Sequence, residues 1–417
     1  MKRYRIAIPS FPGSNGEIDN LAVLKRCGLD AFLFRWNDSL EKLAQVDGYF
    51  FGAGFSYEDR GRSGMVAARD PLFRHLHEEA QKGKVIVGNC NGAQVLVESG
   101  LIPVGDRLRM CLAHNLTREP SGRSYSPGFL NEWVWITPAC KRGRCATADW
   151  EGTMHIPYAH GEGRFVTLEP DLMEELRAND QIAFQYSDAS GKVSPFAPIT
   201  PNGSTDAIAG ICNKEGNVVA LMPHPERTPL GDQYFTSIRS WLDLHPTHDQ
   251  IGTKVHAGDL SSPLTARTPM KTEILIDTII TNNEERTVEQ AARRVVSSLS
   301  LKQYRYVGME KDRSRDLLQS LSFFNPHKEV AYKIEQGSAS IWNSSTKSWD
   351  AVTRQPIAGI PLLRRDIPDT KADALGQGAQ TGVLYDCSNV EEEVLTRSSV
   401  SEIFSNPNAS TLERISY

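Results

Sequence analysis

Short apolar runs alternate with amphipathic segments through the first hundred residues of the chain. The apolar runs are of strand length and lie at 5–9, 31–35, 48–51 and 85–87. Apolar residues recur at helical spacing in the segments that follow them, which predicts helices at 20–27, 71–81 and 92–98. Such alternation is typical of a parallel sheet with helices on both faces.

The next block, 133–225, is richer in strand and turn signals, and its clearest strand is 218–222. We expect this block to complete the same domain, which would then span residues 1–244. Residues 245–269 are polar and carry Gly, Ser, Thr and Pro, a composition typical of a linker.

A different pattern follows from residue 270 to residue 417. Strands are predicted at 273–280, 303–308 and 329–334, and helices at 287–299 and 314–321. The tail after 366 is polar, with further elements expected at 383–385 and 390–397. No internal repeat with a fixed period is visible. Residues 270–417 are therefore predicted to form a small α+β module.

Composition and charge argue against several functional classes. The 417 residues carry a formal charge of −5 and no long basic run, which argues against nucleic-acid binding. No apolar run approaches the length of a membrane span, so no membrane segment is expected. The seven cysteines are scattered and odd in number. This usage is typical of the reducing cytoplasm, and the spacing of the cysteines predicts no metal site.

The segment VIVGNCNGAQVL, 85–96, places a cysteine between a predicted strand and a predicted helix. A turn of this kind lifts Cys90 off the edge of the sheet and directs the main-chain N–H groups of Asn91 and Gly92 toward the same space. The start of a helix lowers the pKa of a thiol, and such amides can stabilise an oxyanion. Cys90 is therefore a candidate nucleophile.

The segment VVALMPHPER, 218–227, ends a predicted strand with a histidine and a glutamate two residues apart. A histidine that acts as a base needs a second group to orient its ring. The carboxylate of Glu226 can reach the far ring nitrogen of His224 from this spacing. His224 is thus a candidate for the base that accepts the thiol proton.

A third strand runs into the glycine-rich turn FFGAGFSYEDRG, 50–61. Small residues there let the main chain approach a substrate closely, and the amide of Gly54 or Phe55 is a candidate second oxyanion donor. Each of the three patterns alone is weak, because buried cysteines and histidines in turns are common. Their occurrence together, in this order, is much more specific.

These stretches resemble the class I glutamine amidotransferases, and most closely the glutaminase subunit of phosphoribosylformylglycinamidine synthase. The resemblance covers nearly all of residues 1–244. It is carried by FPGSN at 11–15, GFSYED at 54–59, NCNGAQ at 89–94, IPYAHGEGRF at 156–165, PNGS at 201–204 and IAGICNKEGNVVALMPHPER at 208–227. The resemblance implies a flavodoxin-like α/β/α sandwich.

The resemblance also implies a reaction and a set of site residues. Cys90, His224 and Glu226 would hydrolyse glutamine through a glutamyl thioester. The residues expected to stabilise the oxyanion or hold glutamine are Gly54, Phe55, Asn91, Gln94, His160 and Gly161. The ammonia would pass to a large synthetase subunit that carries ATP and Mg²⁺, in some assemblies with a small bridging subunit. No cofactor is expected in this chain.

The sequence departs from the family pattern at Ala53, Asn89 and Ala93, where the family more often has glycine, a branched apolar residue, and an aromatic residue or cysteine. The module at 270–417 is foreign to a compact glutaminase. It is similar in size and rhythm to the bridging subunit and would then be ferredoxin-like, or it is a docking or dimerisation appendage. Two further hypotheses stay open: an amidotransferase or γ-glutamyl hydrolase for another acceptor, and a catalytically silent scaffold.

Overall fold

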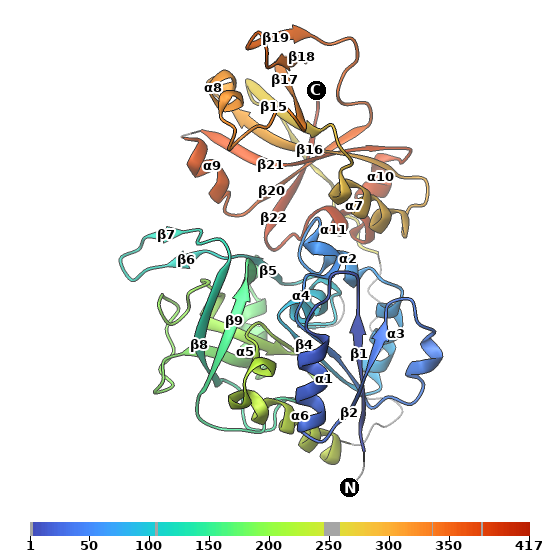
Figure 1. Ribbon diagram of the computed structural model, residues 1–417, viewed down its shortest axis with the longest axis vertical. Helices are drawn as coiled ribbons and strands as arrows, with labels where there is room; N and C mark the ends of the chain where they lie inside the picture. Colours follow the sequence, from blue (N-terminus) through green and yellow to red (C-terminus); the bar gives the residue numbers. More distant parts are fainter. Residues whose placement is uncertain (1–2, 105–106, 246–258, 336, 377) are drawn as a thin grey trace. The chain divides into compact units, whose positions relative to one another are not determined.

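The computed structural model describes residues 3–104, 107–245, 259–335, 337–376 and 378–417 (Figure 1). The chain divides into two compact units, Met1–Ala257 and Gly258–Tyr417. Most of the predicted linker, 246–258, lies outside the described residues, and the strand β14 (Thr265–Arg267) lies within its last part. Among the described residues, none of the helices combines the length and apolar character that a membrane span requires.

Unit 1 is built on a nine-stranded sheet in the order β2-β1-β3-β4-β13-β12-β11-β8-β9. The first five strands are parallel and the remaining four are antiparallel. Their bounds are β1 Arg5–Ser10, β2 Asp30–Arg35, β3 Gly48–Phe51, β4 Val85–Asn89, β8 Leu130–Pro138, β9 Met154–His160, β11 Ile182–Ser187, β12 Ile208–Cys212 and β13 Val218–Leu221. Two small sheets pair β5 (Cys111–His114) with β10 (Glu162–Val166), and β6 (Thr117–Arg118) with β7 (Ser124–Tyr125).

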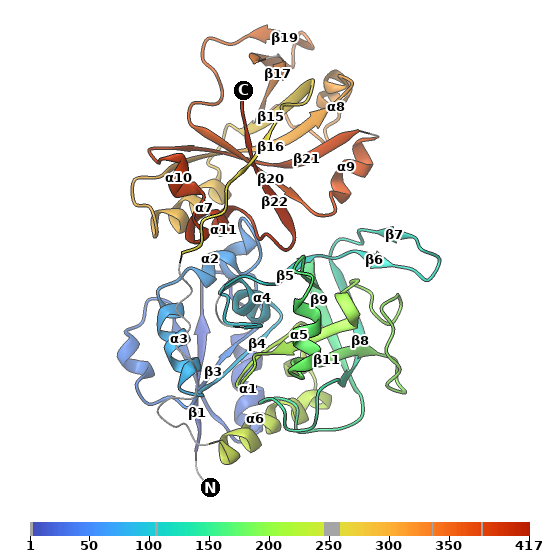
Figure 2. The same ribbon diagram turned by 180° about the vertical axis from the view of Figure 1, so that it is seen from behind.

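Helices cover both faces of this sheet (Figures 1 and 2). They are α1 Glu17–Arg26, α2 Met65–Ala68, α3 Leu72–Gln81, α4 Asn91–Glu98, α5 Leu172–Ala178 and α6 Asp232–Leu244, with short 3-10 turns η1 Leu40–Leu43, η2 Ser56–Asp59, η3 Thr205–Ala207, η4 Pro225–Arg227 and η5 Pro229–Gly231. Neighbouring residues of one strand belong to different cores. Val85 and Val87 pack with α1 and α6, whereas Ile86 packs with α3 and α4. This is the predicted α/β/α sandwich.

Gly92, in the first turn of α4, packs directly against the end of β3. A Cβ atom there would lie 2.1 Å from the main-chain oxygen of Phe51, and a backbone atom cannot move aside without moving the strand. We therefore expect Gly92→Ala to destabilise unit 1 by about 1–3 kcal/mol, measured by thermal and denaturant unfolding. The matched control is Gly161→Ala, whose Cβ would meet only the Phe129 ring, at 3.9 Å. Equal melting temperatures for the two variants would contradict this packing argument.

Unit 2 has a second nine-stranded sheet, in the order β14-β22-β20-β21-β16-β15-β17-β18-β19. The strands after β14 are β15 Thr272–Thr278, β16 Ser300–Met309, β17 Glu329–Glu335, β18 Ser338–Asn343, β19 Ser348–Ala351, β20 Ile360–Asp366, β21 Ala379–Ser388 and β22 Ser410–Ile415. The helices are α7 Asn283–Arg293, α8 Ser314–Gln319, α9 Thr370–Leu375, α10 Glu392–Leu395 and α11 Ser398–Phe404. The α+β class predicted for 270–417 is confirmed, and its sheet is larger than that of a single ferredoxin-like module.

One three-stranded arrangement occurs twice in this sheet. β15, β16 and β17 follow one another through α7 and α8, and β15 pairs with both of the other strands. β20, β21 and β22 follow one another through α9 and α10–α11, and β20 again pairs with both. The two arrangements join where β16 runs antiparallel to β21, from Ser300 opposite Ser388 to Met309 opposite Ala379. Two copies of one topology therefore form a continuous sheet, although the sequence shows no fixed period.

Candidate active site

Cys90 lies between β4 and α4 with a left-handed backbone conformation, φ 52° and ψ −110°. Such a conformation is costly for a residue with a side chain and persists only where surrounding contacts impose it. The main-chain N–H of Cys90 donates to Leu221 (2.8 Å), and its carbonyl accepts from Gln94 (3.1 Å). Gly88 and Gly92 leave room for the turn, because a Cβ at position 88 would lie 2.5 Å from the Gly92 oxygen. The predicted strand–cysteine–helix elbow is present.

His224 and Glu226 follow β13, the strand that pairs in parallel with β4. Nδ1 of His224 lies 2.6 Å from Oε1 of Glu226, and both side chains are 1% exposed. The main-chain N–H of His224 donates to the Pro157 carbonyl (2.8 Å), which ties the loop to β9. The sulfur of Cys90 lies 3.7 Å from the carbonyl oxygen of Ala159, on the same strand β9. The structure therefore brings the three predicted residues to one edge of the sheet.

The charges of this group stabilise one another. Burial alone would lower the pKa of His224, but its interactions with Cys90 and Glu226 outweigh burial and raise the pKa to about 10. Burial would likewise raise the pKa of Glu226, and His224 holds it below its usual value instead. The raised pKa favours the imidazolium form of His224 beside an ionised carboxylate. A proton taken from the thiol can rest on this ring.

Two of the four predicted amide donors are available, and two are engaged. The N–H of Gly92 donates to Gly52 (3.1 Å), and the N–H of Phe55 donates to Gly13 (3.1 Å). The N–H groups of Gly54 and Asn91 make no hydrogen bond within the part of the chain that the structure describes. The candidate oxyanion donors are thus the amides of Asn91 and Gly54.

The N-terminal part of the chain is similar in sequence to known glutamine amidotransferases. The family model of the CobB/CobQ-like glutamine amidotransferase domain matches residues 3–243. The PurQ subunit of phosphoribosylformylglycinamidine synthase from Methanothrix thermoacetophila is 42% identical over 226 residues, which are 54% of this chain and 86% of that protein. The PurQ subunit from Thermomicrobium roseum is 40% identical over 225 residues, which are 54% of this chain and 87% of that protein. This chain belongs to the PurQ family of glutamine amidotransferases.

A solved structure described as PurLQS from Thermotoga maritima is also similar. The two chains are 29% identical, and their alignment covers 58% of this chain and 100% of that chain with a TM-score of 0.44. The match to the family model, residues 3–243, falls within the N-terminal unit. The similarity predicted from the sequence motifs is confirmed.

In this member of the PurQ family, Gln94 is held by its neighbours. Its Nε2 donates to the carbonyl of Glu162 (2.5 Å), and its Oε1 accepts from Nδ2 of Asn91 (2.9 Å). The Asn91 side chain in turn accepts from the N–H of Ser56 (3.0 Å). Gln94 was predicted to hold glutamine. Its amide makes hydrogen bonds that connect α4 to β10 and, through Asn91, to the turn after β3. Each end of the amide can make one further bond, so the contact with glutamine stays a prediction.

His160 is a buried, neutral side chain at the end of β9. Burial, followed by the charge of His224, lowers its pKa to about 3. Its Nδ1 lies 3.1 Å from Oδ1 of Asn115, whose Nδ2 donates to the His160 carbonyl (2.8 Å). The carbonyl of the adjacent Gly161 accepts from the Asn115 N–H (3.0 Å). Asn115 therefore holds His160 and Gly161 in place at the end of β9, and no motif in the sequence indicated this role.

Sequence reasoning also missed two residues behind the triad. Asn89 donates from Nδ2 to Oε2 of Glu226 (3.3 Å) and accepts from the hydroxyl of Tyr234 (3.0 Å). Asn89 was noted only as a departure from the family pattern. Tyr234 lies on α6, far away in the sequence, so only the fold brings the two together.

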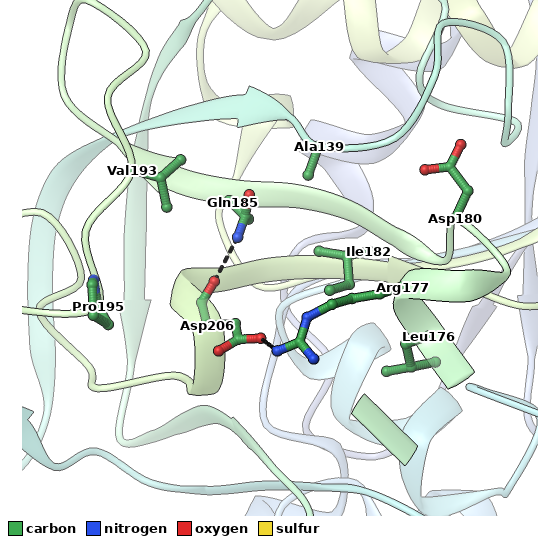
Figure 3. A pocket seen from close by; sticks show the side chains of 9 residues that line it. All are labelled: Ala139, Leu176, Arg177, Asp180, Ile182, Gln185, Val193, Pro195 and Asp206. Atoms are coloured by element: carbon green, nitrogen blue, oxygen red, sulfur yellow. Dashed lines mark hydrogen bonds and ion pairs between the residues drawn. The ribbon is translucent and has the colours of Figure 1, made fainter. Parts of the chain in front are cut away.

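A cavity elsewhere in unit 1 is lined by residues of α5, β11 and η3 (Figure 3). The charged side chains that line it have partners in the structure, and Asp180 accepts from the main-chain N–H of Lys141 (3.0 Å). Arg177 forms an ion pair with Asp206, and Nε2 of Gln185 donates to the Asp206 carbonyl (2.7 Å). None of the triad residues lines this cavity.

Proposed function

We propose that this chain hydrolyses L-glutamine with the triad Cys90–His224–Glu226 and supplies the ammonia to a partner enzyme. The observation that carries the proposal is the buried His224–Glu226 pair, 2.6 Å apart, beside a cysteine held in a left-handed elbow. Membership of the PurQ family supports glutamine as the substrate.

In the first half-reaction, the Cys90 proton rests on His224, and the sulfur attacks the side-chain amide carbon of glutamine. The carbonyl oxygen becomes an oxyanion, which accepts hydrogen bonds from the main-chain amides of Asn91 and Gly54. Nε2 of His224 then donates its proton to the departing nitrogen. The C–N bond breaks, ammonia leaves, and a glutamyl thioester remains on Cys90.

In the second half-reaction, water attacks the thioester carbonyl while Nε2 of His224 accepts a proton from it. The C–S bond breaks, glutamate leaves, and the sulfur and the imidazolium are restored. Glu226 keeps the ring in one orientation throughout and stabilises its positive charge. The buried surroundings strengthen this interaction, because little solvent screens it.

We further propose that the ammonia passes to a large phosphoribosylformylglycinamidine synthetase subunit in purine biosynthesis, with a small bridging subunit as a further partner. ATP and Mg²⁺ would be bound by the large subunit, since this sequence has no Walker-type phosphate loop. No cofactor is proposed for this chain. Another acceptor has less support, because relatives at 42% and 40% identity are named as subunits of this synthase.

A glutamine analogue that carries an electrophile tests the catalytic part of this proposal. We expect a single adduct, located by peptide mass spectrometry on Cys90, whose charge interacts with His224, and none on the other six cysteines. Cys27 is the matched control, because burial raises its pKa to about 11. Cys27→Ser should label like the wild type, and Cys90→Ala should not label. Modification at another cysteine would remove Cys90 from its proposed role.

A further inference from the structure

Asn89 connects the nucleophile strand to the carboxylate of the triad. It is the last residue of β4, directly before Cys90, and is 0% exposed. Its Nδ2 lies 3.3 Å from Oε2 of Glu226, and its Oδ1 lies 3.0 Å from the hydroxyl of Tyr234, which is also 0% exposed. A continuous chain of contacts therefore runs from Tyr234 through Asn89 and Glu226 to His224.

The chemistry of the groups fixes the direction of these hydrogen bonds. An ionised carboxylate only accepts, so the NH₂ end of the Asn89 amide must face Glu226. The oxygen of Asn89 then faces Tyr234, whose hydroxyl must donate. Burial raises the pKa of Tyr234 far above neutrality, which keeps that proton in place. The orientation of Asn89 is thus determined from both sides.

Both oxygens of Glu226 are consequently engaged. Oε1 faces Nδ1 of His224 at 2.6 Å, and Oε2 faces Asn89. The other charged group near the carboxylate is Arg227, whose Nε lies 3.9 Å from Oε1 and whose side chain is 37% exposed. Solvent screens that contact. The main-chain N–H of Glu226 also faces its own carboxylate, so Asn89 is the buried side chain that, together with His224, restrains rotation of the carboxylate.

We infer that Asn89, oriented by Tyr234, is a positioning residue that holds Glu226 against His224 during glutamine hydrolysis. The inference rests on the proposed function of the triad. Asn89 touches neither substrate nor nucleophile sulfur in this role. Asn89 also lies opposite Leu221 in the pairing of β4 with β13, so it is the last paired residue of β4 before the elbow at Cys90.

The test is Asn89→Val, compared with Asn217→Val. Asn217 is also a buried asparagine of unit 1, but its amide bonds the carbonyls of Ala80 and Lys84, away from the triad. For Asn89→Val we expect kcat for glutamine hydrolysis to fall about 10- to 100-fold with little change in KM, the size expected for loss of a hydrogen bond to a charged group. Asn217→Val is expected to lower stability without changing kcat per folded molecule.

The pH profile separates positioning from a general loss of structure. Glu226 helps to raise the pKa of His224, so a less well held carboxylate lets that pKa fall. The alkaline limb of the kcat profile should therefore move to lower pH in Asn89→Val and remain in place in Asn217→Val. An unchanged profile together with an unchanged kcat would overturn the inference.

Tyr234→Phe gives a second route to the same answer if Asn89→Val does not fold. It removes one hydroxyl group, and we expect a smaller loss of kcat and a shift of the alkaline limb in the same direction. Where Asn89→Val does fold, the double variant should lose less than the sum of the two single effects, since both act through one amide. A wild-type profile in Tyr234→Phe would count against the inference. Cys90→Ala is assayed in parallel: glutaminase activity in that variant would defeat the proposed function itself.

Discussion

Replacing Cys90 with alanine is expected to abolish glutamine-driven amidation in the reconstituted synthase, while ammonium salts still support the reaction. The loss should be at least about 10⁴-fold in kcat, because the covalent route through the thioester disappears together with the nucleophile. The synthetase site receives ammonia either way, so its own chemistry is untouched. The two nitrogen sources, compared in one assembly with wild type and variant, measure this directly.

The alanine variant should fold like the wild type. The left-handed conformation at position 90 is as costly for alanine as for cysteine, so the strain is unchanged. Cys27→Ser serves as the control for loss of a thiol elsewhere in unit 1. Loss of the ammonium-driven reaction in Cys90→Ala would mean that the substitution disturbs assembly. Retained glutamine-driven turnover would contradict the assignment of the nucleophile.

The same assay tests a second property of the wild-type chain. Ammonia released without an acceptor is wasted, so we expect slow glutamine turnover by the isolated chain and faster turnover when the synthetase is added. Strong turnover without the partner would contradict this expectation.

Local sequence patterns predicted the elements that hold the chemistry, because those elements depend on short-range properties. An apolar run of strand length, a cysteine and a helical segment specify the elbow at Cys90 with little help from the rest of the chain. The spacing of His224 and Glu226 likewise sets their contact within one short turn. These predictions needed no knowledge of the tertiary structure.

The occupancy of the amide donors could not be predicted in this way. Phe55 looked equivalent to Gly54 in the sequence, but its N–H is taken by Gly13, some forty residues earlier in the chain. The Gln94 amide bonds Glu162 and Asn91, and the sequence did not indicate the contact with Glu162, which lies 68 residues away in the chain. Such assignments depend on long-range pairing, which no local pattern encodes.

The duplicated arrangement in unit 2 was invisible for a related reason. A strand needs only suitable residues on alternate positions, so equivalent strands can differ in sequence. Leu275 of β15 and Leu363 of β20 both pack in one core cluster, as do Ile334 of β17 and Ile415 of β22. The intervening residues are unrelated, so no fixed period survives. The repetition is visible in the strand pairing, because β15 pairs with β16 and β17 as β20 pairs with β21 and β22.

His224→Asn is expected to remove catalysis while leaving the fold intact. The asparagine amide can still donate to Glu226 in place of Nδ1, but nothing replaces Nε2 as the group that accepts and returns the proton. We expect kcat for glutamine to fall by about 10⁴- to 10⁶-fold, the range measured when a member of other triads is removed. Ammonium-driven amidation should persist. Turnover above one-hundredth of the wild-type rate would show that another group serves as the base.

His224→Ala should differ from His224→Asn in stability, not in activity. Alanine leaves the carboxylate of Glu226, 1% exposed, without its cationic partner, which is expected to cost about 3–5 kcal/mol of unfolding free energy. The pKa of His224 is raised, to about 10, so its contribution to stability is complete below its unfolded value of roughly 6.5 and is lost as the pH rises through about 10. The difference between wild type and His224→Ala in urea unfolding should therefore be largest at about pH 6 and shrink toward pH 10. A difference that stays constant between about pH 7 and pH 10 would mean that the ring is already neutral in the folded protein, and that it removes the thiol proton only when glutamine is bound.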